Sequence, residues 1–200
     1  MDELVREIRE SYLKTFEDHL SGSTDTPFYL TDLIIWGLMD RNIGLVESMP
    51  NLIKEENIHA LAPLLRIQLD SLLRLHAFNL VSDPNELADH IIKGNELRKF
   101  KDKEGNLLSD RRLVSSLSSH LPFVEAMYKK LCGWVHFSES HIFTAVSEGK
   151  EDRTIEIGIG DSRKKLDPEL FAESIEAIKA IHLTTIAIMQ SYFEKPRKSV

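Results

Sequence analysis

The stretch IHALAPLLRIQLDSLLRLHAFNLV, residues 58–81, carries the densest apolar pattern in the chain. On a helix at about 100° per residue, its apolar side chains surround nearly the whole circumference. A helix that is apolar on almost every side is buried among other elements. We therefore expect residues 58–81 to form the central helix of a bundle.

Amphipathic segments flank this stretch on both sides. Apolar side chains recur every three or four residues, which is typical of a helix with one buried face. The same reasoning, together with capping residues and prolines, predicts further helices at about 2–20, 28–49, 85–93, 110–120, 122–136 and 167–194. Asp110 is expected to cap the fourth of these. Asp167-Pro168-Glu169 is a strong signal for the start of the last one.

The periodicity changes after His141. Residues 142–146 and 154–159 are rich in β-branched side chains and partly alternate, with a charged, glycine-containing turn between them. We expect a β-hairpin at about 142–159. The predicted fold is thus mainly α, with residues 1–200 forming a single-domain helical bundle with a small β-hairpin before a long C-terminal helix.

Composition excludes several functional classes. The 200 residues include 25 Lys+Arg and 32 Asp+Glu, for a net charge of −7, so nucleic acid or anionic lipid is not attracted overall. Cys132 is the single cysteine and provides neither an intrachain disulfide nor a cysteine metal cage. The start of the chain is acidic, and the apolar run at 33–39 is too short to span a bilayer. We expect a cytoplasmic protein with no membrane partner.

Arg66, Asp70 and Arg74 form a charged stripe on the central helix. Steps of four residues place them on one helical face, within reach of each other. Burying such charges without partners costs several kcal/mol each, so the stripe needs solvent, polar partners or a ligand. It is either a structural seam of ion pairs or an anion site in which Asp70 orients the two guanidinium groups.

A second candidate is the end of the predicted helix at 122–136. Tyr128 and His136 share a face there, and His141 follows in the next segment. His136 could act as a general acid or base, or it could bond the end of its own helix. The histidine spacings match no zinc motif, and no nucleotide-cofactor motif is present, so neither a metal nor a cofactor is expected.

The segment Arg66 to Arg74, followed by Tyr128-x-x-Leu131 and His136-Phe137-Ser138, resembles uncharacterised bacterial all-helical families that are distantly similar to HEPN domains. The resemblance covers about residues 61–141. It implies a helical bundle that dimerises. In HEPN members such a bundle cuts RNA in toxin or defence systems, using an arginine and a histidine with four to six residues between them. No arginine here has that spacing; Arg112 and His120 have seven residues between them.

Three functions follow as hypotheses, and whether the protein is an enzyme stays open. The first is self-association, as a homodimer, or partner binding, because the second and last helices offer more apolar surface than a small bundle needs. The second is metal-independent RNA cleavage with Arg66, Arg74 and His136 as a composite catalytic site. The third is binding of a small anionic ligand by a set of five residues: Arg66, Asp70, Arg74, Tyr128 and His141. The last two require the arginine stripe and His136 to share one open cleft.

Overall fold

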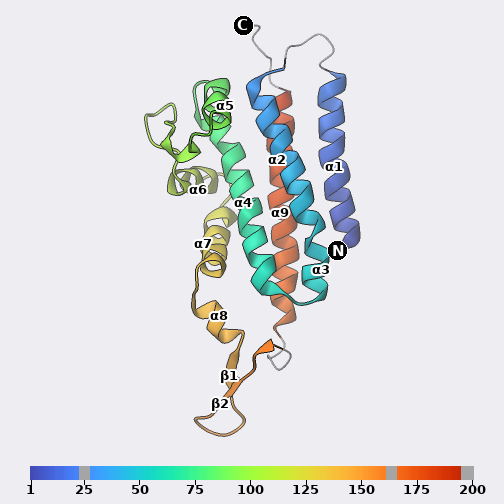
Figure 1. Ribbon diagram of the computed structural model, residues 1–200, viewed down its shortest axis with the longest axis vertical. Coiled ribbons are helices and arrows are strands. Elements are labelled where there is room, and N and C mark those ends of the chain that lie inside the picture. Colours follow the sequence, from blue (N-terminus) through green and yellow to red (C-terminus); the bar gives the residue numbers. More distant parts are fainter. Residues whose placement is uncertain (23–27, 161–165, 195–200) are drawn as a thin grey trace.

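The computed structural model describes residues 1–22, 28–160 and 166–194, and the chain is mainly helical (Figure 1). The helices are α1 (Asp2–Ser21), α2 (Leu30–Glu47), α3 (Met49–Lys54), α4 (Ile58–Leu80), α5 (Pro84–Ile92), α6 (Asp110–Ser118), α7 (Phe123–Val135), α8 (Glu139–Phe143) and α9 (Pro168–Phe193), with a 3-10 turn at Leu97–Lys99. Strands β1 (Val146–Glu148) and β2 (Ile155–Ile157) form an antiparallel hairpin before α9. The predicted fold class is confirmed.

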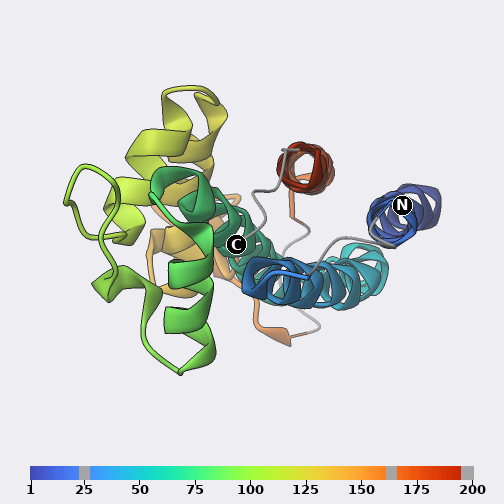
Figure 2. The ribbon, with the colours of Figure 1, turned by 90° about the horizontal axis from the view of Figure 1, so that it is seen from above.

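Helix α4 is the central element. Helices α1, α2, α4 and α9 run along the long axis of the molecule (Figure 1). Helices α1, α2 and α9 lie on one side of α4, and α5, α6 and α7 lie on the opposite side (Figure 2). Helix α4 contacts α2, α3, α5, α6, α7 and α9. Among the described residues, no helix is long and apolar enough to cross a bilayer.

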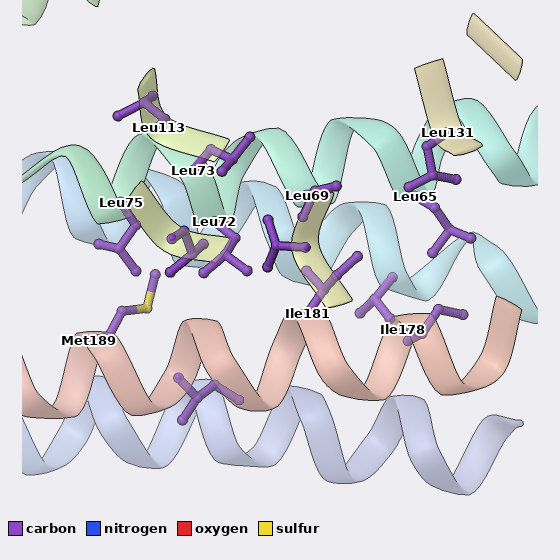
Figure 3. Packing of buried hydrophobic residues seen from close by; sticks show 14 of the residues in the cluster. Leu65, Leu69, Leu72, Leu73, Leu75, Leu113, Leu131, Ile178, Ile181 and Met189 are labelled. Atoms are coloured by element: carbon purple, nitrogen blue, oxygen red, sulfur yellow. The ribbon is translucent and has the colours of Figure 1, made fainter. Parts of the chain in front are cut away.

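The core is built around the leucines of α4. Leu69, Leu72 and Leu73 are fully buried. Figure 3 shows α4 leucines facing Ile178, Ile181 and Met189 of α9 on one side, with Leu113 and Leu131 near the other side. Burying one such side chain contributes about 1.5–3 kcal/mol. The prediction that residues 58–81 form a helix buried among other helices is therefore confirmed.

Two helix boundaries differ from expectation. The predicted second helix, 28–49, ends at Glu47, and a further short helix, α3, begins at Met49, where the prediction ends the helical segment. Pro50 lies in the first turn of α3, where its missing N–H is not needed. The cap of α6 is Ser109, whose Oγ accepts from the Arg112 N–H at 3.3 Å. Asp110 is instead the first helical residue, which leaves its carboxylate available to other partners.

The hairpin is shorter than predicted. Ile142 and Phe143, expected in a strand, belong to α8. Ser138 caps this one-turn helix, and its backbone N–H donates to Nδ1 of His141. Strand pairing begins at Val146, opposite Ile157. A local capping interaction thus overrides the β-propensity of Ile142 and Phe143.

A polar network is buried between α1, α2 and α9. The Tyr12 hydroxyl lies 2.9 Å from Nδ1 of His182 and accepts from Nδ2 of Asn42 at 3.2 Å. All three side chains are at most 1% exposed. Burial raises the pKa of Tyr12 and lowers the pKa of His182 to about 4, because both charged forms lose hydration. His182 is therefore neutral in the folded protein at pH 7.

Stability is expected to fall as the pH drops from about 6.5 to about 4. The unfolded chain protonates His182 in this range whereas the folded chain resists, so protons favour unfolding, by up to about 3 kcal/mol from this group. Denaturant unfolding at several pH values gives the free energy of unfolding as a function of pH. Between about pH 4 and 6.5 this free energy should change less steeply for His182→Gln than for the wild type. Leu183→Gln, at an exposed position of the same helix, should keep the wild-type slope. Equal slopes for both variants would contradict the assignment.

Candidate functional site

The charged stripe of α4 is paired across helices. Arg74 Nη2 lies 3.0 Å from Oδ1 of Asp70 and 2.7 Å from Oδ1 of Asp110, the first residue of α6. Arg66 lies 3.5 Å from Oδ1 of Asp70 and 3.5 Å from Oδ2 of Asp110. These four side chains, which we call the ion-pair network, are 13–38% exposed. Two positive and two negative charges balance within it.

The two arginines are held differently. Arg74 makes the short contacts to both acids, whereas the distances from Arg66 are longer. The Arg66 guanidinium instead lies 4.2 Å from the centre of the Tyr128 ring. Burial opposes its charge, but neighbouring Cys132, Tyr128 and Asp70 raise the pKa of Arg66 on balance. Arg66 is thus a permanent cation that its carboxylate partners hold less closely than they hold Arg74.

Asp110 joins three elements. Besides the two arginines of α4, it accepts a hydrogen bond from the Tyr128 hydroxyl of α7 at 3.1 Å. Burial works against its ionisation, but Arg74, Tyr128 and Arg66 lower the pKa of Asp110 below its ordinary value. The carboxylate therefore remains charged at neutral pH and links α4, α6 and α7.

A pocket of about 280 Å³ opens beside this network. We call it the Arg66 pocket. Its lining comes from α2, α4, α6, α7 and the residue after α7: Arg41, Arg66, Ile67, Asp70, Asp110, Tyr128, Cys132, Val135 and His136. The side chains of Arg41 and His136 are exposed and have no hydrogen-bond or ion-pair partner among the described residues. Two groups that can bind an anion are therefore available at its edge.

The structure brings four of the predicted site residues together. Arg66, Asp70, Tyr128 and His136 all line the Arg66 pocket. Arg74 does not line it and instead holds Asp70 and Asp110 in place. The stripe is thus a structural ion-pair seam that also presents one of its arginines to a pocket.

His141 lies in a different environment. Its ring stacks on His59 and on Phe137, with centroid distances of 5.6 and 5.5 Å, and meets Trp134 edge-on at 5.2 Å. It is not part of the Arg66 pocket lining. The grouping of His141 with Tyr128 and the arginines as ligand-binding residues therefore does not correspond to one pocket.

Sequence reasoning missed two residues of the site. Arg41 is an ordinary exposed arginine of α2, and nothing in its neighbours predicts that it meets α4 and α7. The sequence pattern predicts Asp110 as a helix cap, although an acid beside a serine that can itself cap is free to bond elsewhere. Arg41 lines the same pocket as Arg66 although it lies 25 positions earlier in the chain, and Asp110 joins the site through its contacts with Arg66, Arg74 and Tyr128.

The donor set of the pocket suits an oxyanion. Guanidinium and imidazole groups donate hydrogen bonds to phosphate or carboxylate oxygens, and Arg does so in a planar fork. Within the described residues, no three His, Cys, Asp or Glu side chains are arranged to hold a metal ion. Searches against protein-family models, curated proteins and solved structures return no match to this chain.

Asp110→Ala is expected to lower the free energy of unfolding by about 1–3 kcal/mol, because Arg74 then loses its closest partner in a partly buried setting. Urea denaturation measures the loss. Asp18→Ala, which breaks the exposed pair with Lys14, should cost less than about 1 kcal/mol. A loss at Asp110 no larger than that at Asp18 would mean that the network contributes little to holding α6 against α4.

Proposed function

We propose that the Arg66 pocket binds a phosphate-bearing ligand. The observation that supports this most is the convergence of Arg41, Arg66 and His136 from three separate parts of the chain on one pocket. Arg74 already neutralises the acids Asp70 and Asp110 together with Arg66, so the charge of Arg41 is left unbalanced. The His136 ring adds an N–H group that can donate a hydrogen bond to the same anion.

The size and lining of the pocket support a small anionic group. A volume of about 280 Å³ is close to the lower end of ligand cavities. Ile67 and Val135 add apolar lining beside the charged groups, and the Tyr128 ring holds the Arg66 guanidinium from one side. A phosphate attached to a compact organic part, such as a nucleoside, fits this combination.

Adenosine 5′-monophosphate is expected to bind and adenosine is not, because the phosphate supplies the charge that Arg41 and Arg66 recognise. Isothermal titration calorimetry measures both affinities. Arg41→Ala should weaken binding about tenfold, the loss of one charge-assisted hydrogen bond. Arg6→Ala, an equal change of charge on α1, should bind as the wild type does. Unchanged affinity in Arg41→Ala would refute this use of the pocket.

RNA cleavage is the second candidate, favoured by the exposed His136 at the same pocket as Arg66. His136 would take the proton of a ribose 2′-hydroxyl, and that oxygen would attack the adjacent phosphorus. The bond from phosphorus to the 5′-oxygen would break, leaving a 2′,3′-cyclic phosphate, and the histidine would return its proton to the departing oxygen. Arg41 and Arg66 would stabilise the charge on the phosphoryl oxygens. Such activity agrees with what the resemblance to HEPN domains implies.

The wild type is expected to cut a single-stranded RNA in the presence of EDTA and to leave the matching DNA intact, because DNA lacks the 2′-hydroxyl. His136→Asn should reduce the cleavage rate by at least about a hundredfold, the contribution of a general acid or base. The assay follows product on denaturing gels, and circular dichroism checks that the variant stays folded. Equal rates for the wild type and His136→Asn would assign any cleavage to a contaminant and remove this candidate.

A further inference from the structure

Exposed apolar side chains concentrate in one part of the molecule. Of fourteen large apolar side chains that are exposed among the described residues, seven lie between residues 135 and 159. By contrast, α9 buries most of its isoleucines and leaves only Leu183 strongly exposed in its described part. The exposed apolar surface is therefore concentrated near the hairpin, with a smaller group at the start of α2 (Phe28, Leu30 and Leu33), and not on the last helix.

The register of the hairpin sorts its side chains onto two faces. Val146 is opposite Ile157, and Glu148 is opposite Ile155. Side chains of directly opposed residues point to the same face, and alternate residues of one strand share a face. Ile155 and Ile157, which are each 64% exposed, therefore lie on one face together with Val146 and Glu148, while Ser147 and Glu156 lie on the other. Strand β2 presents an apolar face without cover.

The position of the hairpin explains why the described part of the chain does not cover this face. Figure 1 shows α8, β1 and β2 extending beyond the end of the long helices. A two-stranded hairpin is only marginally stable in water unless its apolar face is packed. We call residues 137–159, which include α8 and the hairpin, the arm.

We infer that a second copy of this chain covers the apolar face of the arm, giving a two-fold dimer. A two-fold contact sets the same patch of both copies together, so an isoleucine strip meets its own equivalent. Six large apolar side chains of the arm are 48–84% exposed: Phe137, Ile142, Phe143, Ile155, Ile157 and Ile159. Together they present on the order of 700 Å², close to the roughly 800 Å² that each partner contributes to a standard interface.

Charge argues against an anionic membrane as the alternative occupant. The segment 146–157 holds four acids and two bases: Glu148, Glu151, Asp152, Glu156, Lys150 and Arg153. Surface-binding segments that use anionic lipid carry an excess of Lys and Arg. The hairpin has no such excess, so an anionic membrane is the less suitable occupant.

Size-exclusion chromatography with light scattering tests the dimer on the full chain. The wild type should be dimeric, and Ile155→Asp with Ile157→Asp should raise the dissociation constant at least about a hundredfold. Leu183→Asp, an equally exposed apolar position on α9, should remain dimeric. Circular dichroism should show unchanged helix content in the arm variant, because no long helix depends on the hairpin face.

A cross-linking measurement covers the case in which the arm variant misfolds. In a Cys132→Ser background, Ile157→Cys should form an intermolecular disulfide under mild oxidation, and Leu183→Cys should not. A monomeric wild type, an arm variant that stays as dimeric as the wild type, or equal cross-linking at both positions would each overturn the inference. If the wild type is monomeric and binds vesicles, the apolar face of the arm contacts a membrane and not a second copy of the chain. None of these results depends on ligand binding at the Arg66 pocket.

Discussion

Burial of α4 on nearly every side is the constraint on which the rest of the structure depends. Apolar helices cover most of its circumference, but Arg66, Asp70 and Arg74 occupy one strip that apolar residues alone cannot cover without a large desolvation cost. Asp110 of α6 and Tyr128 of α7 supply the polar cover. The docking of these two helices is therefore set by charge and hydrogen bonding as well as by apolar packing. Asp110 and Tyr128 also line the Arg66 pocket.

Much of the fold could be predicted because its signals are local. The apolar repeat of α1, the circumferential pattern of α4 and the Asp167-Pro168 start of α9 are each contained within one segment. The start of the hairpin could not be predicted in this way. Isoleucine and phenylalanine favour strands, but Ile142 and Phe143 belong to a helical turn that the Ser138 cap and its hydrogen bond to His141 stabilise. Where two local preferences compete in a few residues, composition does not decide the outcome.

In the candidate site, too, the residues that local spacing brings together could be predicted, whereas those that tertiary packing brings together could not. Arg66, Asp70 and Arg74 could be placed together because spacing along one helix determines their proximity. Tyr128 and His136 were found by residue type at a helix end, although nothing in the sequence shows that this end faces the stripe. Arg41 and Asp110 come from other helices, and their approach depends on how α2 and α6 pack against α4. The sequence predicts the charged stripe, but it does not predict which of the two arginines lines a pocket.

In the proposed function, the unequal pairing of the two arginines sets which anions the Arg66 pocket would recognise. Arg74 engages both carboxylates at 2.7 and 3.0 Å, so Arg66, at 3.5 Å from each, keeps donor capacity for a ligand. The same carboxylates also line the pocket and repel any anion that extends past Arg66. A ligand must therefore place one compact anionic group against Arg41 and Arg66 and keep the rest of its structure uncharged. A chain with a net charge of −7 is compatible with this proposal, because the proposed recognition is confined to one small pocket.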